Sequence, residues 1–99
     1  MTALELLERL DGLLAEEREA IQVLDGETVS ALADEKSRIL EKLNGCKAEL
    51  REERLAPAVE IVVAGLRRNG VLLAHARSCL RDFVGALKSE HEGHISIRG

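Results

Sequence analysis

Apolar residues recur along most of the chain at alternating intervals of three and four, the spacing of helices that pack together as in a coiled coil. The pattern predicts three helices, over residues 3–24, 28–53 and 58–88. Short connections between successive helices favour antiparallel neighbours. The sequence therefore predicts an all-α fold. Residues 1–88 form an antiparallel three-helix bundle, a helical hairpin plus a long third helix, and residues 89–99 form a flexible tail that lacks the pattern.

The first two predicted helices carry recognisable end signals. Thr2 and Glu5 fit a capping box, in which a hydroxyl and a carboxylate bond the free amide groups of the first turn. Gly26 is expected to adopt the left-handed conformation that follows a helix end. Asp25 or Thr28 then caps the second helix.

Each predicted apolar stripe contains one polar member, which is Glu17 in the first helix, Lys36 in the second and Asn69 in the third. In an antiparallel hairpin, residues at equal distances from the turn face each other. A turn centred between Gly26 and Glu27 therefore places Glu17 opposite Lys36 across the seam, and Asn69 falls within about one helical turn of the same level.

We interpret these three residues as a structural polar clamp. A buried ion pair is costly to break but seldom adds much net stability when intact, so its use here is to fix the register of the hairpin. A slipped register would bury Glu17 and Lys36 against leucine. Arg18 and Glu35 are expected to form a more exposed pair beside the clamp. A catalytic carboxylate–lysine pair is rejected, because the sequence offers no nucleophile or glycine-rich loop to match it.

The third predicted helix is longer than the hairpin it packs against. The first turn lies level with about residues 79–83 of that helix, if the rise per residue is the same in all three helices. Beyond this level Val84 and Leu87 have no hairpin to cover them, and Ile95 and Ile97 follow in the tail. Two interpretations remain open: these residues form a docking site for another chain, or the tail folds back over the end of the bundle.

Composition narrows the classes of function. The chain has 99 residues, of which 45% are apolar and 32% charged, and a formal net charge of −4. This suffices for one small domain, and interleaved charges give no reason to expect nucleic acid or anionic lipid as a partner. The first residues lack the basic region of a signal peptide, and no apolar run reaches the roughly 20 residues that insert across a membrane. Cys46 and Cys79 lie near opposite ends of the predicted bundle, too far apart for a disulfide within the chain. We therefore expect reduced thiols and a cytoplasmic protein.

The tail holds the remaining candidate chemistry, the run His91-Glu92-Gly93-His94. Two histidines three apart can bind a transition metal. The zinc protease pattern, however, needs a helix with two residues between the glutamate and the second histidine, and Gly93 disfavours a helix. We interpret the run as a solvated tail, and we predict no metal site, no cofactor and no enzymatic activity.

Three short motifs follow one another along the predicted helices: an acidic–basic step late in the first, an E-K step opening the second, and an N-G-x-L-L step in the third. Here they are Glu17-Arg18, Glu35-Lys36 and Asn69-Gly70-Val71-Leu72-Leu73. In this order and spacing they resemble the FlgN family of bacterial flagellar export chaperones, over about residues 3–88.

The resemblance implies a cytosolic chaperone of the flagellar type III export system. Proteins of that family bind the C-terminal segments of the hook–filament junction (hook-associated) proteins, prevent their premature assembly and deliver them to the export gate. Their contacts lie in the C-terminal part of the chain. Carried over, these contacts correspond to one set of client-binding residues, Leu80, Phe83, Val84 and Leu87, with Ile95 and Ile97 more loosely included.

One departure from the family pattern affects the gate. Family members often end in a tail that contains Tyr-Gly and is used there, whereas this chain has no tyrosine and ends Ile95-Ser96-Ile97-Arg98-Gly99. The aromatic gate anchor therefore does not carry over. The alternative to a chaperone is a structural coiled-coil module that self-associates, for example as a homodimer, through the same apolar surface.

Overall fold

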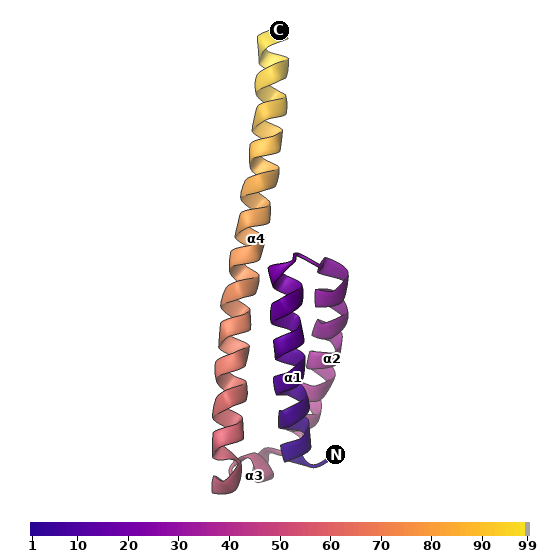
Figure 1. Ribbon diagram of the computed structural model, residues 1–99, viewed down its shortest axis with the longest axis vertical. Coiled ribbons are helices and arrows are strands. Elements are labelled where there is room, and N and C mark those ends of the chain that lie inside the picture. The colour runs from indigo at the N-terminus through magenta and orange to yellow at the C-terminus, as the bar shows by residue number, and fades with distance from the viewer. Residues whose placement is uncertain (99) are drawn as a thin grey trace.

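The computed structural model is all-helical, as the sequence predicts, and it describes the backbone of residues 1–98 and the side chains of residues 1–89. In chain order the elements are α1 (Ala3–Gln22), α2 (Gly26–Asn44), the short α3 (Lys47–Leu50), the 3-10 turn η1 (Glu53–Leu55) and α4 (Ala56–Arg98). The molecule measures 68 × 20 × 20 Å, because α4 extends far beyond the other helices (Figure 1).

α1 is the central helix of the bundle. α2 packs antiparallel to it on one side, and α4 packs against it on the other and runs parallel to it (Figure 1). The predicted three-helix bundle is therefore confirmed, with an up-down-up order. The core consists mainly of α1 leucines, joined by residues of α2 and α4: Leu6, Leu7, Leu10, Leu13, Leu14, Leu32, Ile39, Leu43 and Val62.

α1 ends in a turn whose left-handed residue is a leucine. The amide of Leu24 donates to the carbonyl of Ile21 (3.1 Å), and the amide of Asp25 donates to the carbonyl of Ala20 (2.9 Å), which is the Schellman pattern of helix termination. Leu24 has a φ of 54°. The prediction that Gly26 takes this conformation is wrong, because α1 ends two residues earlier than predicted and Gly26 begins α2.

Side chains cap the starts of α1 and α2. The Thr2 hydroxyl accepts from the Glu5 amide (3.1 Å), and the Thr2 amide donates to the Glu5 carboxylate (3.4 Å), so the predicted capping box is present. At α2 the Asp25 carboxylate accepts from the Thr28 hydroxyl (2.6 Å) and the Thr28 amide (3.2 Å). These hydrogen bonds lower the pKa of Asp25 because they stabilise its ionised form, and the bond from the Thr28 hydroxyl has the larger effect.

The second predicted helix is broken in the structure. α2 ends at Asn44 and Gly45 forms its C-cap, after which the chain passes through α3 and η1 before α4 begins. Glycine in a helix interior costs about 1 kcal/mol relative to alanine, which favours the break at this position. The turn that follows buries Leu55 to 1% exposure at the end of the bundle.

α4 continues through Arg98, so the predicted flexible tail over residues 89–99 is wrong for residues 89–98. Gly93, which was expected to disfavour a helix in this segment, costs only about 1 kcal/mol, and extending a helix that is already formed is far easier than starting one. The last turns of α4 lead away from the bundle (Figure 1). This rules out the alternative in which the tail folds back over the end of the bundle.

Candidate docking groove

The polar clamp lies at the centre of the bundle, with one residue from each long helix. Glu17 of α1 is fully buried (0% exposed). Its carboxylate accepts from Lys36 Nζ of α2 at 2.9 Å and from Asn69 Nδ2 of α4 at 2.8 Å, one bond to each oxygen. The structure therefore brings together all three residues that the sequence placed at one level.

Two further hydrogen bonds complete the network around Asn69. Its Nδ2 also donates to the carbonyl oxygen of Leu14 at 2.8 Å, and its Oδ1 accepts from Arg18 at 3.1 Å. α4 approaches α1 closely here, since a Cβ on Gly65 would lie 3.1 Å from the Leu14 side chain. Among the described side chains, every buried polar atom has a hydrogen-bond partner. Clamp residues are thus bonded to one another, which suits a structural role.

The predicted pairing of Arg18 with Glu35 is wrong. Arg18 lies at the seam between α1 and α4, where it bonds Asn69, and Glu35 of α2 pairs instead with Arg9. The error has a geometric cause: residue numbers predict the level of a side chain along the hairpin, but not the side of α1 from which it projects.

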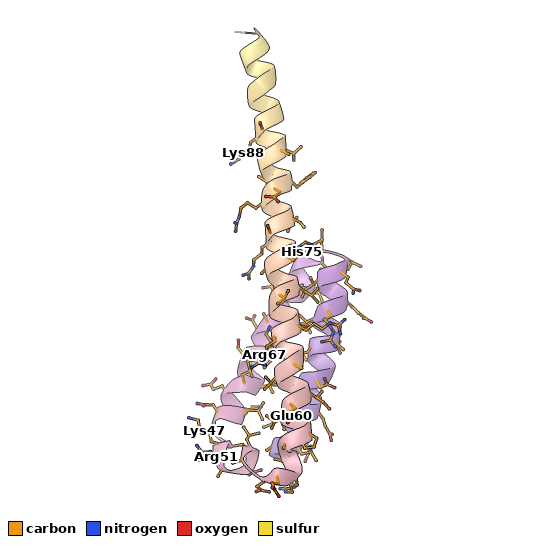
Figure 2. The ribbon with its side chains drawn as sticks, turned by 90° about the vertical axis from the view of Figure 1, so that its left-hand side faces the viewer. Lys47, Arg51, Glu60, Arg67, His75 and Lys88 are labelled. Atoms are coloured by element: carbon orange, nitrogen blue, oxygen red, sulfur yellow. The ribbon has the colours of Figure 1, made fainter. Side chains whose placement is uncertain are left out.

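Beyond the level of the hairpin, the apolar residues of α4 are uncovered. Leu80 is 46% exposed, Phe83 63%, Val84 48% and Leu87 50%. Figure 2 shows this stretch, which begins near His75 at the end of the hairpin and reaches Lys88 well above it. The side chains of Ile95 and Ile97 lie outside the described residues. Four of the six predicted client-binding residues are therefore exposed along one short stretch of α4.

A hollow opens where the end of the hairpin meets this stretch. It has a volume of about 210 Å³ and is lined by residues from α1, its turn, α2 and α4: Ile21, Leu24, Gly26, Val29, Leu73, Ala76, Arg77 and Leu80. A shallower hollow continues along α4, lined by Arg77, Leu80, Arg81, Val84, Gly85 and Lys88. The two share Arg77 and Leu80, so they form one surface, which we call the docking groove.

The predicted site and the observed groove overlap in part. Leu80 and Val84 line the groove, whereas Phe83 and Leu87 are exposed on the adjoining part of the α4 surface. The hairpin residues Leu24 and Val29 and the cations of α4 also line the groove, although they are not among the predicted site residues. The spacing of Arg77, Arg81 and Lys88 on a predicted helix was a signal in the sequence that these cations share one side of it. No local signal identifies Leu24, because its position depends on where α1 ends.

The remaining candidate chemistry adds nothing to this groove. Cys46 is partly buried and Cys79 is exposed, and both are free thiols. Among the described residues, no cluster of three or more histidine, cysteine or acidic side chains could hold a metal ion. Over the same part of the chain, no helix combines the length and apolar character needed to cross a bilayer. The side chains of His91 and His94 lie outside the described residues.

Comparison with known proteins finds no match for this chain among family models, curated proteins or solved structures.

Proposed function

We propose that this protein is a cytoplasmic export chaperone of the bacterial flagellar type III system. In this proposal the docking groove holds the C-terminal segment of a hook–filament junction protein, keeps it from assembling early and carries it to the export gate. The observation that carries the proposal is the uncovered apolar stretch of α4 beyond the hairpin, where four large apolar side chains are each 46–63% exposed. The motif resemblance supplies the client and the gate.

The exposed apolar surface of α4 supports binding of a partner helix. Contiguous exposed apolar residues on a small protein mark a surface that binds a partner. A long helix with an apolar stripe fits one recurring mode of recognition, in which an amphipathic helix of the partner packs its apolar side chains along the stripe. A client segment bound in this way has its own apolar face covered, so it cannot pack into the growing filament. This work needs neither a cofactor nor turnover.

The experiment is a binding titration of the full chain with the purified C-terminal segment of a hook–filament junction protein. We expect the wild type to bind, and Phe83→Asp/Leu87→Asp to weaken binding at least about tenfold, since two apolar contacts are replaced by charges. Both side chains are exposed, so the melting temperature should not change.

The matched control is Ile61→Asp/Val71→Asp, which introduces the same charges on the same helix at exposed apolar residues outside the groove (58% and 69% exposed). It should bind the segment within about twofold of the wild type, because surface substitutions away from a site have small effects. A wild type that binds no junction segment contradicts the proposal. Equal loss in both variants places the binding surface elsewhere.

Self-association through the same stretch is the second candidate function, and the same exposed side chains favour it. Sedimentation of the wild type separates the two. A stable dimer that the junction segment does not dissociate, and that Phe83→Asp/Leu87→Asp abolishes, supports the structural module.

A further inference from the structure

We propose that the docking groove selects an acidic amphipathic helix, whose carboxylates lie against Arg77, Arg81 and Lys88. The identity of that helix as an export client rests on the proposed function, whereas its charge and shape follow from the groove. The proposal is carried by three cations that lie beside the apolar residues of the groove.

The three cations share one side of α4. At about 100° per residue they fall within about 40° of one another around the helix, although they span residues 77–88. The apolar residues Leu80 and Val84 lie on the adjoining arc, so the apolar stripe has a basic border along one edge. Asp82, the one acidic residue in this stretch, lies about 120° away from the cations around the helix.

The basic border contrasts with the chain as a whole, whose formal net charge is −4. All three cations are exposed. The ion pairs among the described side chains are Arg9–Glu35, Lys36–Glu17 and Arg54–Glu52, and they include neither Arg77 nor Arg81. These guanidinium groups are therefore available to a partner's carboxylates, for which arginine is the best-suited donor.

A second copy of the chain does not fit this surface. If two copies pair antiparallel about the middle of the stretch, Arg77 of each faces Lys88 of the other. If they pair parallel, each cation faces its own counterpart. Both arrangements set like charges against each other, which disfavours the pairing.

A lipid surface fits less well than a helix. A basic amphipathic helix can lie on an anionic membrane, but such binding uses a convex helix surface pressed into the lipid. Here the groove is concave where Leu24 and Val29 of the hairpin stand opposite Leu73 of α4. A row of side chains from another helix fills such a hollow. From Leu73 to Lys88 the groove is about 23 Å long, which corresponds to a partner helix of about 16 residues.

The test uses the full chain and two fluorescent synthetic peptides of about 18 residues, which form about five helical turns. Both have leucine at heptad spacing; one carries glutamate along one edge of the leucine stripe, and the other carries lysine at the same positions. We expect the wild type to bind the glutamate peptide at least about tenfold more tightly in low salt, because three modest surface ion pairs add together. The preference should shrink as the salt concentration rises.

Charge reversal provides the decisive comparison. Arg77→Glu/Arg81→Glu/Lys88→Glu should invert the preference, so that the lysine peptide binds more tightly. The control Lys47→Glu/Arg67→Glu/Arg68→Glu changes the net charge equally at exposed residues outside the groove and should keep the wild-type preference. Circular dichroism checks that both variants remain helical. Equal binding of the two peptides by the wild type, or no binding of either, overturns the proposal.

Two further outcomes also overturn the proposal. One is a stable wild-type dimer in sedimentation that Val84→Asp dissociates. The other is tighter binding to phosphatidylserine vesicles than to the glutamate peptide.

The failures of the two proposals are distinguishable. If a junction segment binds and the reversal of the three cations leaves its affinity unchanged, the acidic helix is wrong and the chaperone proposal stands. If the glutamate peptide binds with the expected charge dependence and no junction segment does, the groove chemistry stands and the chaperone proposal is wrong.

Discussion

The two halves of α4 share a spacing of apolar residues but have different surroundings. In the half beside the hairpin, residues 56–76, Val62 is 4% exposed and Asn69 is 1% exposed. In the half beyond it, residues 77–98, Val84 is 48% exposed and Leu87 is 50% exposed. We call these the anchored half and the overhang. Both have apolar residues at the same alternating spacing, which in the overhang continues as far as Leu87, so the spacing alone does not say which residues are buried.

The difference follows from helix lengths. α1 has 20 residues and α4 has 43. At 1.5 Å per residue they span about 30 Å and about 65 Å, so the hairpin can cover only about half of α4. An apolar stripe that extends beyond the end of the neighbouring helix leaves an exposed surface on which another helix can pack. The anchored half supplies stability, and the overhang supplies the surface on which both proposals depend.

The clamp offers the largest test of this comparison, because it joins α1, α2 and the anchored half of α4 through the buried Glu17 carboxylate. Lys36→Met leaves the Glu17 carboxylate buried without its cation and should lower the free energy of unfolding by about 3 kcal/mol. This value is at the low end for a broken buried ion pair, because the Lys36 side chain is 19% exposed. Denaturant titration measures the change. Peptide or client affinity of the folded protein should stay the same.

Lys42→Met is the matched control, since it removes an exposed lysine from the same helix and should change stability by less than about 0.5 kcal/mol. A Lys36→Met protein with unchanged stability and selectively lost binding would mean that Lys36 belongs to the binding surface rather than to the clamp.

A pair of identical substitutions sharpens the comparison between the halves. Val62→Ala removes two buried methyl groups and should cost about 2 kcal/mol, from lost burial and the cavity left behind. Val84→Ala removes the same groups from an exposed position and should cost less than about 0.5 kcal/mol. The order should reverse for binding, because only Val84→Ala should weaken the binding of the acidic peptide. Equal losses of stability in the two variants would show that the overhang is packed against something in solution.

The turn between α1 and α2, which lies beside the start of the overhang, gives the smallest expected effect. Leu24 holds a left-handed backbone that is unfavourable for leucine, so Leu24→Gly should stabilise the protein by about 1 kcal/mol. It also removes an apolar side chain from the groove and should weaken peptide binding. Leu24→Ala removes the same side chain but keeps the unfavourable backbone, so it should weaken binding without the gain in stability. Thermal denaturation and peptide titration of both variants check this, and a loss of stability in Leu24→Gly would contradict the backbone argument.

The helices and the clamp were open to prediction because both follow from periodicity. A polar residue in an apolar stripe is visible in the sequence, and residues at equal distances from a turn must face each other in a hairpin. Glu17 and Lys36 could therefore be paired, and Asn69 could be placed at their level. The uncovered residues of α4 followed in the same way, from a third stripe longer than the first two.

The sequence alone does not determine where the helices end or from which side of a helix a residue projects. Both depend on the tertiary structure. Single glycines shift helix propensity by only about 1 kcal/mol, so they cannot decide alone whether a helix breaks, as at Gly45, or continues, as at Gly93. The end of α1 puts Leu24 in the groove, and the central position of α1 turns Arg18 toward Asn69. The spacing of apolar residues along a helix is a local property, and the sequence alone determines it. Which part of a stripe stays uncovered depends on how far its neighbour reaches, and only the packed helices settle that.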